Sequence, residues 1–224
     1  MPTIPLDLNG YTDLPAGKIA TIVTYLEMRT PPEPRPVPRG PWTLARIGDD
    51  VQRYRALFRR VGEPWLWFGR LVIGDAALRG ILADPAVEAL ALRREGGDIG
   101  LLELDFRQAG ACELSYFGLV PEAVGQGAGR FLMSEAVARA FARPIGRFWV
   151  HTCTLDHPGA VGFYVRSGFS PYKRAIEVAD DPRLTGLVPR RRASDPHTIG
   201  TCGAAVRGTS PVSRGSSATS IARL

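Results

Sequence analysis

Apolar residues recur along the first 180 residues in short patterned stretches that predict strands and helices. β-Branched and aromatic residues crowd residues 19–28, which we expect to form a strand. Apolar residues at three- and four-residue spacing over 51–61 predict an amphipathic helix that Pro64 ends. Between these two elements, residues 31–41 hold six prolines, so this stretch should run as an extended connection.

The middle of the chain predicts a second helix followed by neighbouring strands. Asp75 begins a short helical stretch that reaches about Leu82, and Pro85 ends it. Three strand-like runs follow, at residues 86–94, 99–107 and 112–120, with glycines in the turns between them. Short glycine-containing turns join antiparallel neighbours, so these runs predict an antiparallel meander.

Helices and strands alternate in the last part of the folded region. The predicted elements are a helix at 127–142, a strand at 148–155, a helix at 158–167 and a strand at 172–178. Residues 190–224 are rich in Ser, Gly, Arg and Thr with few large apolar side chains, so we expect a disordered tail.

The composition is typical of an ordinary folded protein. The chain is 45% hydrophobic and 22% charged, and no stretch approaches the roughly 20 apolar residues of a membrane span. No basic segment followed by an apolar run marks a secretion signal at the N-terminus. Three cysteines at irregular spacing do not suggest a disulfide framework. We therefore expect a cytoplasmic protein that does not act at a membrane.

The formal net charge of +6 belongs mostly to the tail. Six arginines and one aspartate lie between Arg190 and the C-terminus, a net of +5, which leaves +1 for the 189 residues before them. A protein that reads nucleic acid should carry its positive charge on the folded domain. The distribution therefore does not predict a nucleic-acid partner.

Alternating glycines follow the last strand of the meander and precede a helix. In such a turn, backbone N–H groups converge on an anion, and the helix N-terminus adds a partial positive charge. A dinucleotide fold would place an acidic residue about 20 residues beyond the glycines, where this chain has Trp149. No Lys-Ser or Lys-Thr follows them, as a P-loop requires. An ordinary surface turn remains the alternative to an anion site.

Two segments together resemble the signature regions of the GNAT superfamily of N-acetyltransferases. They read V-P-E-A-V-G-Q-G-A-G-R-F-L from Val120 and H-P-G-A-V-G-F-Y-V-R-S-G-F from His157. The resemblance spans roughly residues 45–180, which we take as the N-acetyltransferase domain, preceded by a strand and proline-rich segment at 1–44. It implies an α/β (α+β) fold with a mixed, mostly antiparallel central sheet flanked by helices. It also implies acetyl-CoA as co-substrate, without a metal, and acetyl transfer to a primary amine by direct attack on the thioester.

The resemblance also assigns cofactor contacts. The backbone of Leu119 and Val120, where two central strands splay apart, would bind the pantetheine arm. The pyrophosphate would bind the turn formed by Val124, Gly125, Gln126, Gly127, Ala128, Gly129 and Arg130. Two positions depart from the family pattern. Val124 stands where the family usually has Arg or Gln, and His157 stands where it often has the Asn that contacts the pantetheine amide.

Three residues are candidates for proton transfer. By resemblance, Tyr164 would protonate the departing thiolate, although it could instead belong to an aromatic cluster that packs its helix. Glu113 and Glu103 are carboxylates within apolar strands, and burial would raise their pKa and suit them as bases. Strand alternation places Glu113 on one face with Ser115 and Phe117, and Glu103 with Leu101 and Asp105. Solvated or paired carboxylates, or a water chain as the base, remain alternatives.

The remaining features concern metals and partners. His151, Cys153, Asp156 and His157 carry ligand atoms, but no second ligand pair appears, so we expect no metal. The acceptor is expected to be an amine, a small molecule rather than a protein. The sequence does not determine the oligomeric state, and a homodimer is one possibility. A non-catalytic CoA-binding sensor or interaction module is the alternative to an enzyme.

Overall fold

A computed structural model describes residues 3–33 and 35–189, and these residues contain seven strands and four α-helices. The predicted tail at 190–224 lies outside them. The elements are β1 (Lys18–Met28), β2 (Thr43–Arg46), α1 (Val51–Gly62), η1 (Glu63–Trp65), α2 (Asp75–Ala83), β3 (Val87–Arg94), β4 (Gly97–Asp105), β5 (Ala111–Leu119), η2 (Pro121–Ala123), α3 (Ala128–Phe141), β6 (Arg147–Cys153), α4 (Ala160–Arg166) and β7 (Ser170–Asp180).

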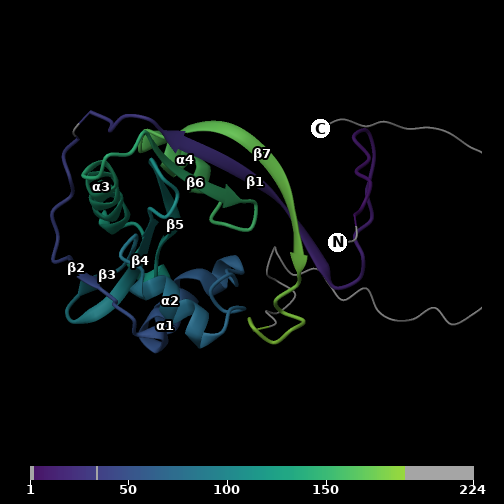
Figure 1. The fold of residues 1–224 in the computed structure, drawn as a ribbon, viewed down its shortest axis with the longest axis horizontal. Helices are drawn as coiled ribbons and strands as arrows, with labels where there is room; N and C mark the ends of the chain where they lie inside the picture. The colour runs from purple at the N-terminus through teal and green to yellow at the C-terminus, as the bar shows by residue number, and fades with distance from the viewer. Residues whose placement is uncertain (1–2, 34, 190–224) are drawn as a thin grey trace, which may run out of the picture. The chain divides into compact units, whose positions relative to one another are not determined.

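All seven strands join one mixed sheet in the order β2-β3-β4-β5-β6-β1-β7 (Figure 1). Every neighbouring pair is antiparallel except β5 and β6, which are parallel. The predicted meander of β3, β4 and β5 and the mostly antiparallel sheet are confirmed. The strand β2 was not predicted, because four residues directly after a proline-rich segment carry too little pattern.

The N-terminal strand β1 lies inside the sheet, between β6 and β7. It is antiparallel to both, and its Tyr25 is opposite His151 on one side and Lys173 on the other. This strand precedes the region of family resemblance in the chain. It nevertheless supplies the hydrogen bonds that join β7 to the rest of the sheet.

Helices cover both faces of the sheet. Neighbouring side chains of β5 point in opposite directions, so they contact helices on opposite faces. On one face, Tyr116 packs edge-on against Phe58 of α1, with ring centroids 4.9 Å apart. On the other face, Phe117 stacks on Phe163 of α4 at 5.6 Å. The α1 helix begins where the Asp50 carboxylate accepts the Arg53 N–H at 2.9 Å, an N-cap that satisfies a free backbone donor.

A β-bulge at Ser115 changes which face Glu113 occupies. Glu103 is opposite Tyr116, whereas the next residue of β4, Leu104, is opposite Leu114. The extra residue shifts the alternation by one position, so Glu113 shares a face with Tyr116 and Glu103. The prediction that Glu113 shares a face with Phe117 is therefore wrong, while the shared face of Glu103 and Asp105 agrees with the register.

Within the described residues, none of the helices combines the length and the apolar character needed to cross a bilayer.

Candidate active site

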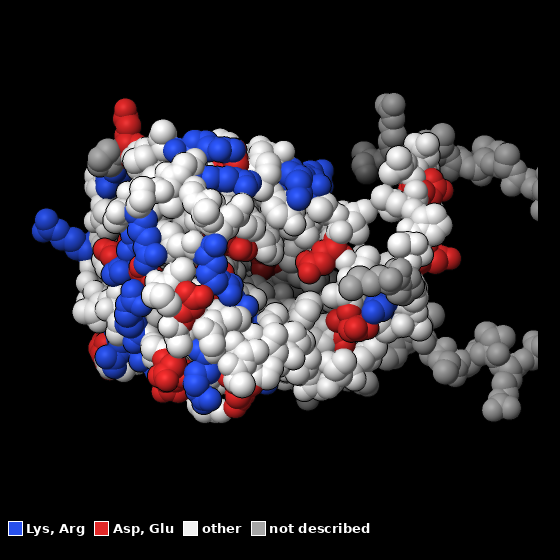
Figure 2. Space-filling model, in the orientation of Figure 1, with Lys and Arg blue, Asp and Glu red and all other residues white. Residues whose placement is uncertain are grey.

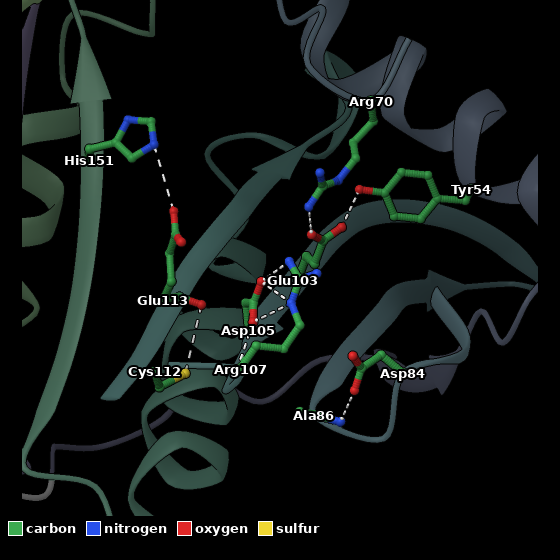
Figure 3. A network of polar contacts seen from close by, with 10 residues as sticks. All are labelled: Tyr54, Arg70, Asp84, Ala86, Glu103, Asp105, Arg107, Cys112, Glu113 and His151. Atoms are coloured by element: carbon green, nitrogen blue, oxygen red, sulfur yellow. Dashed lines mark hydrogen bonds and ion pairs between the residues drawn. The ribbon is translucent and has the colours of Figure 1, made fainter. Parts of the chain in front are cut away.

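Three carboxylates from β4 and β5 lie on the sheet face that α1 covers (Figure 3). Glu103 is fully buried, and both of its oxygens are engaged. Its Oε2 accepts a hydrogen bond from the Tyr54 hydroxyl, and its Oε1 pairs with the Arg70 guanidinium. A buried carboxylate held by two donors is tied to the packing of α1 and the loop after it.

Asp105 is likewise paired. Its carboxylate accepts from the Nε of Arg107 at 2.9 Å. Burial acts to raise the pKa of Asp105, but the hydrogen bonds and charge of Arg107 outweigh it and hold the pKa below its ordinary value. Asp105 is therefore ionised at neutral pH, and its lowered pKa makes it a poor proton acceptor.

Glu113 differs from both neighbours because, among the described residues, it is paired with no arginine, and the basic side chain beside it is a histidine. Its Oε1 lies 3.8 Å from His151 Nε2, and its side chain is 28% exposed. Burial raises the pKa of Glu113 from 4.5 to about 7, and the charge of Asp105 adds to the effect. A carboxyl that ionises near neutrality is suited to accept and release protons.

His151 lies opposite Tyr25 of β1 and faces Glu113 from β6 (Figure 3). Burial lowers the pKa of His151, against the opposing charges of Glu177 and Asp156. The imidazole is therefore mostly neutral at pH 7. The sequence drew attention to His151 only as a metal ligand, and its place beside Glu113 was not predicted.

The parallel strands β5 and β6 separate just beyond Glu113. Their pairing covers only Ala111–Glu113 and Arg147–Trp149, although both strands continue. The N–H of Val120 donates to the Ile99 carbonyl at 3.0 Å, so that donor is already used within the sheet. Because pairing alternates along an antiparallel ladder, the backbone groups of Leu119 point away from β4, toward the space that β6 leaves.

The glycine turn has the backbone form of an anion site. Gly125 and Gly127 adopt φ values of +83° and +89°, a left-handed conformation that glycine adopts without strain. The α3 helix starts at Ala128, and no described side chain caps its first turn. Backbone N–H groups at the start of an uncapped helix need an outside acceptor, which an anion can supply.

The side chains of the turn already have partners within the protein. Gln126 accepts a hydrogen bond from Arg94 and donates one to the Glu122 carbonyl at 2.8 Å. Arg130 donates to the Pro36 carbonyl at 3.1 Å. Val124 has no polar group and is 56% exposed.

Tyr164 lies on the opposite sheet face from Glu113. Its ring meets those of Phe117 at 6.3 Å and Phe169 at 5.8 Å, so the predicted aromatic cluster exists. Burial raises the pKa of Tyr164 well above its ordinary value, and the Asp156 charge adds to this effect. The phenol therefore stays protonated at neutral pH, the state that a proton donor requires.

Asp156 organises the end of β6 and was not predicted as part of a site. It accepts hydrogen bonds from Trp67 Nε1 at 2.9 Å, from Thr152 Oγ1 at 2.7 Å and from the Cys153 N–H at 2.9 Å. These bonds tie the loop after α1 to β6. The neighbouring His157 accepts the N–H of Gly159 on its Nδ1 at 2.9 Å, and its ring packs against Trp65.

No set of three His, Cys, Asp or Glu side chains within residues 3–33 and 35–189 is arranged to hold a metal ion.

Known proteins resemble this chain in both sequence and fold. Residues 54–169 match the acetyltransferase (GNAT) family. No match is found among curated proteins. A GCN5-related N-acetyltransferase from Sphaerobacter thermophilus has a similar structure, with a TM-score of 0.54 and 18% identity over 72% of this chain and 52% of that one.

Two further structures give similar values. A putative GNAT-family acetyltransferase from Novosphingobium aromaticivorans has a TM-score of 0.51 and 18% identity, covering 73% of this chain and 66% of that chain. A functionally unknown conserved protein from Staphylococcus epidermidis has a TM-score of 0.51 and 12% identity, and the match covers 74% of this chain and 64% of that chain. This chain thus spans less than two thirds of each structure, and the likeness concerns the fold. Because the family match covers just over half of the 224 residues, the chain belongs to the GNAT family of acetyltransferases.

Proposed function

We propose that this protein transfers the acetyl group of acetyl-CoA to a primary amine of a small molecule by direct attack on the thioester. Glu113 is the general base and Tyr164 the general acid. The observation that carries the proposal is the position of Glu113, at the point where β5 and β6 separate, with a pKa of about 7 and no arginine partner among the described residues.

The cofactor is assigned to the C-terminal end of β5, whereas Glu113 lies near the start of that strand, where the gap between β5 and β6 begins. The pyrophosphate binds the N–H groups of the turn from Val124 to Arg130, and the pantetheine arm runs beside the Leu119 backbone. Of the two backbone positions expected to hold that arm, we assign the contact to Leu119, because the Val120 N–H already donates to Ile99. The thioester then lies in the gap between the two strands.

The base and the acid approach this gap from opposite faces of the sheet. Glu113 lies on the face covered by α1, and Tyr164 lies on the face covered by α4. An amine that enters from the Glu113 side meets the carbonyl carbon, and the sulfur leaves toward the Tyr164 side. This arrangement supports a direct transfer without an acetylated protein intermediate.

The proton balance follows from these positions. Glu113 takes a proton from the ammonium ion, and the free amine forms the C–N bond. The C–S bond then breaks, and the thiolate takes the Tyr164 proton. The second proton lost by the nitrogen restores the phenol, so one proton is released for each acetyl group transferred. Glu103 is a weaker candidate for the base because Tyr54 and Arg70 occupy both of its oxygens.

A turnover screen tests this function. The full chain is mixed with acetyl-CoA and a panel of primary amines, and released thiol is measured. We expect amine-dependent release that falls by about 10²- to 10⁴-fold in Glu113→Gln, the usual range for loss of a general base. CoA binding without thiol release across the panel would instead favour the non-catalytic sensor or interaction module.

A further inference from the structure

The connection from β1 to β2 passes over the glycine turn and lies outside the family match at residues 54–169. We call residues 29–33 and 35–42 the proline strap. Figure 1 shows it as the dark trace that leaves β1, passes beside α3 and reaches β2. The Pro36 carbonyl accepts a hydrogen bond from Arg130 at 3.1 Å. A Cβ at Gly127 would lie only 3.1 Å from Pro38 Cβ, so strap and turn are in close contact.

The strap is also fixed to α4 and to the first turn of α3. The Arg35 guanidinium donates to the Arg166 carbonyl at 2.8 Å, at the end of α4. The Trp42 ring packs against Phe131 with centroids 5.5 Å apart. Prolines reduce the number of conformations that the unbound segment can adopt. The strap is therefore held in place beside the turn before any ligand binds.

Four arginines belong to the strap or to the turn and its contacts. Arg35 and Arg39 belong to the strap, Arg94 contacts Gln126, and Arg130 lies within the turn itself. Figure 2 shows basic side chains, interspersed with acidic ones, toward the side of the molecule that carries α3, β2 and β3 in Figure 1. The acidic side chain closest in sequence to the turn, Glu122, is paired with Arg60 at 3.0 Å. The four arginines of the strap and the turn, rather than the mixed surface around them, favour a ligand with several negative charges.

CoA is such a ligand, because it carries a pyrophosphate and a third phosphate on its ribose. The turn offers backbone donors, but Val124 contributes none from its side chain. Guanidinium groups bind phosphate through paired, charge-assisted hydrogen bonds. We propose that the proline strap forms one wall of the CoA site and that Arg35 and Arg39 bind CoA phosphate groups. This inference rests on the proposed function.

The variant Arg39→Ala tests the strap. Arg39 is exposed and forms no ion pair with the described residues, so its loss should leave the melting temperature unchanged. We expect the Kd for CoA, measured by titration calorimetry on the full chain, to rise about tenfold, which is typical for one charge-assisted contact. Arg39→Lys should recover part of this loss. The matched control is Arg29→Ala, because Arg29 lies at the start of the same strap and is paired with Glu27 at 2.9 Å.

The outcomes separate the strap from the catalytic proposal. The strap proposal is supported if the wild type binds CoA, Arg39→Ala binds CoA more weakly, and the Kd of Arg29→Ala stays within twofold of the wild-type value. Equal CoA affinity in wild type and Arg39→Ala overturns the strap proposal and leaves the proposed function standing. A wild-type protein that does not bind CoA overturns both.

Discussion

Replacing Glu113 by glutamine should stabilise the protein at alkaline pH while it removes the catalytic base. The carboxyl has a pKa of about 7 in the folded state against an ordinary value of 4.5. Below pH 4.5 the group is protonated in both the folded and unfolded states. Above pH 7 it is ionised in both, and the folded state carries the whole cost of a buried charge. The wild-type free energy of unfolding therefore falls between these pH values, relative to that of the variant.

The size of the effect follows from the difference of about 2.5 between the two pKa values. At about 1.4 kcal/mol for each pKa unit, the difference corresponds to about 3.5 kcal/mol at most. The side chain is 28% exposed, and solvent screening reduces the effect. We compare the free energy of unfolding of Glu113→Gln with that of the wild type. We expect this difference to be about 1–2 kcal/mol more favourable to the variant at pH 8 than at pH 4.5.

Urea unfolding at several pH values, followed by tryptophan fluorescence, measures this gain. The charged and titratable groups that face Glu113 are Glu103 and Asp105 from β4, Arg107 just after β4, Arg70 from the loop after α1 and His151 from β6. They are present in both proteins, so their own titration largely cancels in the comparison. The control is Glu135→Gln, which removes a partly exposed carboxylate from α3. A stability difference between Glu113→Gln and wild type that does not change with pH would refute the reasoning.

The same ionisation should govern catalysis. Because the base acts as the carboxylate, kcat/KM of the wild type should rise with pH until Glu113 is fully ionised, with a midpoint near 7. This rise should be absent in Glu113→Gln, whose remaining rate should be lower by about 10²-fold or more.

Three further substitutions examine other parts of the account. Tyr164→Phe should lower turnover by about 10²-fold without changing CoA affinity, measured by thiol release and calorimetry, and unchanged turnover would exclude the acid role. Gly127→Ala should lower stability by about 1–3 kcal/mol, because φ is +89° and the new methyl group meets Pro38 at 3.1 Å; a melting temperature equal to wild type would contradict this. Phe58→Ala, at a fully buried position, should cost about 3–5 kcal/mol in urea unfolding, and a loss below 1 kcal/mol would show that the site refills.

Local patterns were sufficient to predict most elements of the fold. The apolar runs of β3, β4 and β5 and the spacing of apolar residues in α1 depend on neighbouring residues, so the sequence displays them directly. The position of β1 between β6 and β7 depends on pairing such as that of Tyr25 with His151, far apart in the chain. No local pattern encodes that choice.

The site shows the same division. The glycine turn could be found because its backbone form requires glycines at fixed spacing. The sheet face on which Glu113 lies could not be predicted, because no residue type marks the bulge at Ser115. The bulge reverses the alternation of side chains between Glu113 and the rest of β5. The sequence also did not predict that arginines pair with Glu103 and Asp105 but not with Glu113. Arg70 comes from the loop after α1 and reaches Glu103 only in the folded protein.

The central claim is that the acetyl group passes directly from CoA to an amine at the gap between β5 and β6. A single-turnover experiment tests it most directly: protein in excess over acetyl-CoA labelled in the acetyl group is mixed with an amine from the screen and quenched at short times. We predict that label leaves CoA and enters the acetylated amine at the same rate, with none bound to the protein. Label that accumulates on the protein first, or that never reaches an amine, would contradict the account.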